Sequence, residues 1–229
     1  MIRPNLYKDI HKLVRKHLFS FSEDCAKVDF TSDNEVQEYQ QKFEGWAEFL
    51  EMHALNENMG LHPLLVNKNA DISRVTHDHE ELEGEVAKLR DQVVAIAGST
   101  SDDEKIALAH EHYLDLQMYI YHQLGHLNEE ERVIMPLLQS LYTDEELEGV
   151  IQAIFTHMDD THFIHAMLGM VDACNLHEVE DMVSNTKKYK PQSLDNLLTS
   201  IRPMVGDETA DLWVAKYQQA SEEASEEAS

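Results

Sequence analysis

The sequence predicts an all-α fold, an up-down-up-down four-helix bundle followed by additional shorter helices. Its 229 residues include only 8 Gly and 5 Pro, and they are rich in Glu, Leu, Ala and Gln, which favour helices. No segment shows the alternation of β-branched and polar residues that is typical of a strand. A Ser or Thr followed three residues later by Glu marks helix starts at Ser32, Ser101 and Thr143.

These helix starts divide the first part of the chain into long helical segments. We expect helices over about 5–20, 33–60, 71–97 and 102–139. The links between them are short and polar, and short links between long helices place consecutive helices antiparallel. Residues 1–140 are therefore predicted to form the four-helix bundle.

The rest of the chain is predicted to form shorter helices that pack on this bundle. Within residues 141–220, Asn175 begins a looser fourth capping box, and we expect breaks around Asn175, Pro191 and Pro203. The final residues 221–229 read SEEASEEAS. Such an acidic, low-complexity segment cannot bury enough apolar surface to offset its ordering, so we expect it to be disordered.

Charge and cysteine usage exclude several classes of function. The formal net charge of −26 argues against nucleic-acid and anionic-membrane partners, because both carry negative charge themselves. Cys25 and Cys174 have no CxxC spacing, so neither a disulfide framework nor a thiolate metal site is indicated. The basic N-terminus lacks the apolar stretch of a signal peptide, and no long apolar run occurs. We expect a cytoplasmic protein.

One combination of residues occurs twice in the chain. HALNENMGLHPLL at 53–65 and HLNEEERVIMPLL at 126–138 share His, Glu, Pro, Leu and Leu at matching places. A spacing of four residues puts a His and a Glu on one face of a helix, about one turn apart. Neighbouring apolar residues indicate that both faces point inward, where unpartnered imidazole and carboxylate groups are costly. A shared metal site would satisfy all four groups at once.

The other two helices offer one histidine each toward the same interior. His11 has apolar residues three and seven positions later, and so does His79. His77 has Glu and Gly at those positions, so the helical phase favours His79 over His77 as the inward-pointing residue.

This pattern resembles the hemerythrin-like, or HHE cation-binding, domain family. In that family a lone His stands on the first and third helices and HxxxE on the second and fourth, and the similarity covers roughly residues 5–140. The resemblance implies a bundle around two non-haem irons. It implies these ligands: His11 and His53 on one iron, His79 and His126 on the other, and Glu57 and Glu130 between them. Open positions on the metals would then admit a small ligand.

The chain departs from the oxygen-carrying members of that family. Those members use an extra His on the third helix, four residues from the first, where this chain has Val75 or Glu83. His122, one turn before His126, could supply a fifth nitrogen, and Glu83 could supply an oxygen. This departure argues against simple reversible oxygen carriage.

The remaining histidines are expected at the surface or at helix ends. This group contains His17, His62, His110, His112 and His177. A second cluster could be a metal site, but it has no partner repeat; its members are His157, His162 and His165.

These observations lead to one main functional hypothesis and two alternatives. The main hypothesis is a non-haem di-iron protein that binds or senses iron or a diatomic ligand such as O₂ or NO, with Mn or Zn possible in the same ligand cage. The first alternative is a di-iron enzyme that acts on peroxide or NO. The weaker one is a metal-dependent phosphohydrolase that uses the dyad His77 and Asp78. A protein partner could bind through the C-terminal helices.

Overall fold

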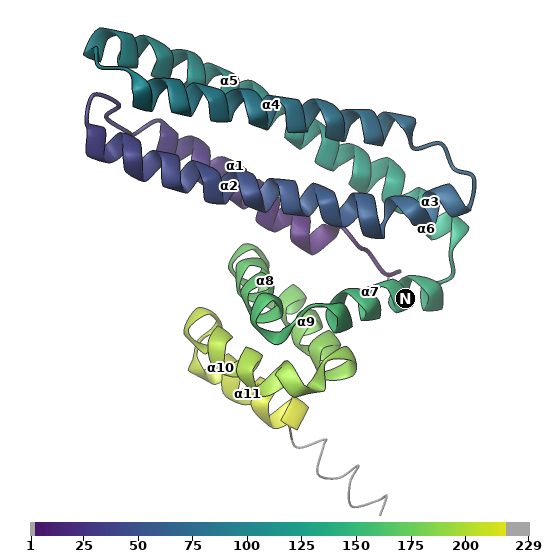
Figure 1. Cartoon of the computed structure of the whole chain (residues 1–229). Helices are drawn as coiled ribbons and strands as arrows, with labels where there is room; N and C mark the ends of the chain where they lie inside the picture. Colours follow the sequence, from purple (N-terminus) through teal and green to yellow (C-terminus); the bar gives the residue numbers. More distant parts are fainter. Residues whose placement is uncertain (1–2, 219–229) are drawn as a thin grey trace, which may run out of the picture. The chain divides into compact units, whose positions relative to one another are not determined.

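The computed structural model describes residues 3–218, and every regular element in that range is helical (Figure 1). The elements are α1 (Lys8–Cys25), α2 (Asp33–Gly60), α3 (His62–Asn67), α4 (Ser73–Gly98), α5 (Asp102–Glu129), the π-helix η1 (Glu130–Ile134), α6 (Met135–Leu141), α7 (Asp144–His157), α8 (Asp160–Ala173), α9 (Leu176–Tyr189), the 3₁₀-helix η2 (Pro191–Ser193), α10 (Leu194–Val205) and α11 (Asp207–Gln218). The all-α prediction is confirmed for these residues. None of the described helices has the length and apolar character needed to cross a membrane.

The chain divides into two compact units. One unit spans Val14–Leu141, and the other combines the residues up to Leu13 with those from Tyr142 onward. The division falls inside α1, which runs without interruption from Lys8 to Cys25. The packing of the C-terminal helices on the bundle stays a prediction.

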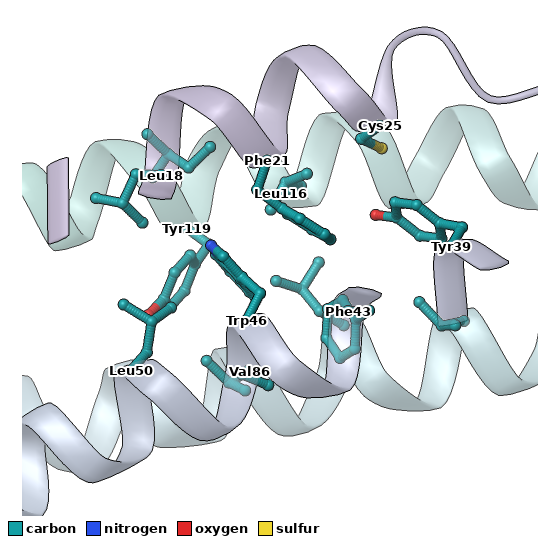
Figure 2. Close-up of a cluster of buried hydrophobic side chains, with 14 of the residues drawn as sticks. Leu18, Phe21, Cys25, Tyr39, Phe43, Trp46, Leu50, Val86, Leu116 and Tyr119 are labelled. Atoms are coloured by element: carbon teal, nitrogen blue, oxygen red, sulfur yellow. The ribbon is translucent and has the colours of Figure 1, made fainter. Parts of the chain in front are cut away.

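Four long helices, α1, α2, α4 and α5, supply one shared core in the Val14–Leu141 unit. Figure 2 shows its aromatic centre, where Phe21 of α1 lies against Trp46 and Phe43 of α2. The rings of Phe21 and Trp46 are stacked with centroids 4.6 Å apart, and Tyr119 of α5 meets Trp46 edge-on at 5.4 Å. Ring pairs in these geometries add to the free energy gained by burying their apolar surface.

The predicted helix starts are found, but their capping differs from the prediction. Thr143 and Asn175 form complete capping boxes with the Glu three residues later. Ser32 and Ser101 use only the hydroxyl half of the motif. The carboxylate of Glu35 instead accepts a hydrogen bond from the backbone N–H three residues before the cap. The capping box at Asn175, which matches the sequence motif least closely, is therefore one of the two that form both hydrogen bonds.

The fourth predicted helix is not one continuous α-helix. After α5 the chain widens into η1, where the N–H of Met135 donates to the carbonyl of Glu130. Pro136 gives the physical reason, because proline has no N–H to donate to Arg132 and its ring crowds that carbonyl. A π-turn accommodates this break without ending the helical path, and α6 continues to Leu141.

The C-terminal helices have a core of their own. Phe163 and Met167 of α8, Val183 of α9 and Leu197 of α10 are buried together. The predicted breaks near Asn175 and Pro191 are found, and the break predicted around Pro203 falls three residues later, between α10 and α11. Pro203 itself lies inside α10, which ends at Val205, and the next residue, Gly206, has a φ of 86° that suits glycine. Residues 221–229 lie outside the described residues.

His112 was expected at the surface, and the structure shows that this expectation is wrong. The ring is fully buried, with Nε2 2.6 Å from the hydroxyl of Tyr39 and Nδ1 3.3 Å from Oε1 of Gln92. Because an amide oxygen only accepts, Nδ1–H donates to Gln92 and Nε2 accepts from Tyr39. Burial lowers the pKa of His112 to about 4, against a smaller opposite effect of the Asp115 carboxylate.

We expect this buried imidazole to make the protein acid-sensitive. Between the folded-state pKa of about 4 and the ordinary value of 6.5, the unfolded chain binds more protons. The free energy of unfolding therefore falls as the pH falls through this window, by roughly 3 kcal/mol in total. Urea unfolding of the metal-free protein at several pH values measures this slope. His112→Gln keeps an acceptor without a titrating group, and an unchanged slope in this variant would contradict the assignment.

Candidate metal centre

Two buried His–Glu pairs come from the repeated segments. On α2, Nε2 of His53 lies 3.3 Å from Oε1 of Glu57. On α5 and the start of η1, Nε2 of His126 lies 3.4 Å from Oε1 of Glu130. Glu57 is 4% exposed and Glu130 is fully buried. The spacing of four residues therefore does what the sequence predicts, placing each imidazole and carboxylate on one buried helix face.

His79 of α4 joins both pairs. Its Nε2 lies 2.8 Å from Nε2 of His126, 3.5 Å from Oε2 of Glu57 and 3.7 Å from Oε1 of Glu130. One ligand atom from each of these four residues lies within 4.8 Å of all the others. Such convergence of imidazole nitrogens and carboxylate oxygens is what a metal ion of the Fe, Mn or Zn type binds.

A second group of four includes His11 from α1. Ligand atoms of His11, His53, Glu57 and Glu130 also lie within 4.8 Å of one another, and all four residues are buried. His11 stands less than one turn before Val14, the first α1 residue of the core that α1, α2, α4 and α5 share, on the same unbroken helix.

The two groups share their carboxylates. Glu57 directs Oε1 at His53 and Oε2 at His79, so its two oxygens face imidazoles of different groups. Glu130 also belongs to both groups. A carboxylate placed in this way can hold two ions at once, one through each oxygen.

The charges in the cavity favour a cation. Burial alone would disfavour a charged imidazole at His79, but the carboxylates of Glu130 and Glu57 outweigh it and raise the pKa of His79 to about 9. A proton on His79 thus partly offsets two buried carboxylates. A metal cation can take over this role, with the imidazole then neutral and its Nε2 lone pair available.

Two residues near the centre were not found by sequence reasoning. Asn58 holds His79 in place, since its Oδ1 lies 3.0 Å from Nδ1 of His79. This hydrogen bond fixes the proton on Nδ1 and directs Nε2 into the cavity, an arrangement that is common behind metal-binding histidines. Asn58 follows Glu57 directly, and only its neighbourhood to a ligand could have indicated this role.

His62 was expected at the surface or at a helix end, and it does lie at a helix end, as the first residue of α3, but it is buried. It is 4% exposed, and its ring stacks on that of His79 with centroids 5.1 Å apart. Burial, followed by the nearby imidazole of His79, lowers the pKa of His62. A sequence signal did exist: His62 occupies the place of Met135 in the other repeat, and Met135 is buried too.

Several other candidates lie outside both groups. His77 is exposed, and its Nε2 lies 3.3 Å from Oε1 of Glu81, whereas His79 is buried and belongs to one of the groups. The helical phase therefore predicted correctly which of the two histidines points inward. His122 is exposed and lies 2.7 Å from the carboxylate of Glu85. Glu83 is exposed as well. The cluster that was weighed as a second metal site is fully at the surface; its members are His157, His162 and His165.

A third group of potential ligands is already neutralised by lysines. Asp9, Cys174 and Glu178 place ligand atoms within 4.8 Å of one another. Nζ of Lys12 contacts both oxygens of Glu178, at 2.6 and 2.5 Å, and Nζ of Lys8 lies 3.4 Å from Asp9. These ammonium groups occupy the place that a cation would take.

No family model, curated protein or solved structure matches this chain. The candidate centre therefore depends on its own geometry, in which buried imidazoles and carboxylates from α1, α2, α4 and the α5–η1 segment converge.

Proposed function

We propose that this chain is a hemerythrin-like protein whose first four long helices form an up-down-up-down bundle around two non-haem iron ions. One ion takes His11 and His53, the other takes His79 and His126, and Glu57 and Glu130 bridge them. The observation that carries this proposal is the position of Glu57, whose two oxygens face His53 at 3.3 Å and His79 at 3.5 Å.

The cost of burial supports a metal in this cavity. Two carboxylates removed from water destabilise a fold strongly unless cations or hydrogen bonds compensate them. A single proton on His79 compensates one negative charge, whereas two divalent ions compensate both carboxylates and use every imidazole lone pair. Mn or Zn suits the same ligand types, and iron is proposed from the family resemblance.

The ligand count supports binding of a small molecule. Each ion would receive two imidazole nitrogens and two carboxylate oxygens, which leaves positions open in an octahedral ligand set. Bound iron with open positions would offer a binding place for a diatomic ligand such as O₂ or NO. We therefore propose that the protein binds or senses iron together with such a ligand.

Purification under iron supplementation tests this function. We expect about two irons per chain and an absorption spectrum that changes when NO is added without oxygen. Less than one iron per chain would contradict the metal centre. Two bound irons with a spectrum that does not change on addition of NO or O₂ would contradict the proposed ligand binding. Multiple turnover of peroxide or NO would favour an enzyme instead.

A further inference from the structure

Tyr39 and His112 form a buried hydrogen-bonded pair that the proposed metal centre does not use. Tyr39 of α2 is 2% exposed, and His112 of α5 is fully buried. The phenol oxygen of Tyr39 lies 2.6 Å from Nε2 of His112. Because Nδ1 of His112 donates to Gln92, Nε2 accepts this hydrogen bond from the phenol. A buried phenol thus donates directly to a buried base.

The protonation states of the pair suit a proton transfer that follows the loss of an electron. Burial lowers the pKa of His112 to about 4, so the ring is neutral at pH 7 and its Nε2 lone pair is available. Burial also raises the pKa of Tyr39, so the phenol keeps its proton while it is reduced. Loss of one electron turns a phenol into a strong acid. The proton then moves to the neighbouring imidazole.

Polar side chains behind His112 can stabilise the imidazolium that this transfer forms. Nδ1 of His112 donates to Oε1 of Gln92 at 3.3 Å, and the amide nitrogen of Gln92 donates to Oδ2 of Asp115 at 2.5 Å. The carboxylate of Asp115 also favours a positive charge on His112 directly. A charge on the imidazole is therefore connected through one amide to a negative group, and such a chain strengthens the hydrogen bonds within it.

Aromatic rings connect Tyr39 with the helices that carry the candidate ligands (Figure 2). The ring of Tyr39 is stacked with that of Phe21 at a centroid distance of 5.4 Å, and Phe21 is stacked with Trp46 at 4.6 Å. Tyr119 meets Trp46 edge-on at 5.4 Å. Trp46 and Tyr119 each lie seven residues, about two helical turns, before the histidine of their repeat. Closely packed aromatic rings support electron tunnelling, so these rings offer an electron a route from Tyr39 toward the candidate centre.

We propose that Tyr39 and His112 form a one-electron redox site that takes up an oxidising equivalent from the candidate metal centre. The phenol loses one electron, its O–H bond breaks, and an N–H bond forms at Nε2 of His112. The products are a neutral phenoxyl radical and an imidazolium ion. Hydrogen peroxide at the centre takes this electron together with one from a bound metal ion and two protons from solvent, and is reduced to water. The site goes beyond the proposed function and rests on it only for the source of the oxidant.

Photo-oxidation of the metal-free protein tests the pair without the metal centre. Illumination with ruthenium tris-bipyridine and persulfate supplies a one-electron oxidant, and electron paramagnetic resonance records the radicals. Exposed tyrosine radicals meet and couple, whereas a buried radical persists. We expect a persistent phenoxyl signal that narrows when the tyrosines carry deuterium on their rings. Tyr39→Phe should lose this signal.

Tyr119→Phe is the matched control. Tyr119 is also 2% exposed, but its hydroxyl donates to the amide oxygen of Gln123 at 3.1 Å, and an amide is too weak a base to take up the proton. This control variant should keep the signal. His112→Gln, which retains a hydrogen-bond acceptor but no base, should lose it. A persistent signal that survives Tyr39→Phe or His112→Gln, or that disappears in Tyr119→Phe, would overturn the proposal.

A measurement on the wild-type protein covers variants that fail to fold. With ¹⁵N-labelled histidine, the persistent radical should couple to one imidazole nitrogen and to one exchangeable proton. Absence of either coupling would overturn the proposal.

Addition of hydrogen peroxide to the iron-loaded protein tests the connection to the centre. The same persistent signal should appear, and iron-loaded protein that does not give it would overturn the proposal. Failure to bind iron, shown by metal analysis, would instead overturn the proposed function, whereas photo-oxidation of the metal-free protein tests Tyr39 and His112 independently of iron.

Discussion

Changing Glu57 and Glu130 together to Gln is expected to abolish binding of both metal ions. The amide keeps the size of each side chain but loses the negative charge, so the cavity no longer compensates divalent cations. Changes to residues that only support metal ligands weaken binding about 10- to 100-fold, and loss of both bridging carboxylates should exceed that range. Metal analysis after iron loading should show fewer than one ion per chain.

The matched control for this variant changes net charge equally without touching the cavity. Glu81 and Glu83 are exposed residues of α4, so their double change to Gln removes two negative charges from the surface. We expect this control to retain the wild-type metal content. Equal metal content in both double variants would show that the ions bind through the general acidic surface instead.

Phe43→Ala is expected to have the largest effect on stability. Phe43 of α2 is fully buried in the core of the Val14–Leu141 unit, beside Phe21 and Trp46 (Figure 2). Removal of a buried phenyl ring costs the transfer free energy of the ring and leaves a cavity, about 3–5 kcal/mol together. Urea unfolding of the metal-free protein measures this loss in the free energy of unfolding.

Phe19→Ala provides the control on the neighbouring helix. Phe19 is 57% exposed, and a surface truncation of this kind should change the free energy of unfolding by less than about 0.5 kcal/mol. Because neither residue belongs to the candidate centre, both variants should bind wild-type amounts of metal while they are folded. A loss below about 1 kcal/mol for Phe43→Ala would contradict the core as described.

Sequence signals that act within one helical turn predicted where helices begin. Ser32 and Ser101 begin α2 and α5 at the predicted residues, since a hydroxyl at the cap works within one turn. The prediction extended the fourth helix through Pro136 without a break. The spacing of apolar residues does not show where a π-turn accommodates a proline. Likewise Pro203 stays inside α10.

Helical phase predicted which ligand candidates within a helix are buried. It gives no prediction for residues beyond the end of that helix. The spacing of four and the apolar neighbours placed His53, Glu57, His126 and Glu130 correctly, and they separated His79 from His77. His62 lies past the end of α2, where the phase of that helix no longer applies. His112 is one turn before the buried Leu116, so the helical phase of these two residues indicates that His112 is buried.

A crystal structure of the metal-loaded protein, with data collected at the absorption edge of the metal, tests the central claim most directly. We expect two anomalous peaks among the long helices, with the carboxylates of Glu57 and Glu130 lying between them and an imidazole pair on each side. A cavity without a peak, or ions held only by exposed carboxylates, would contradict it.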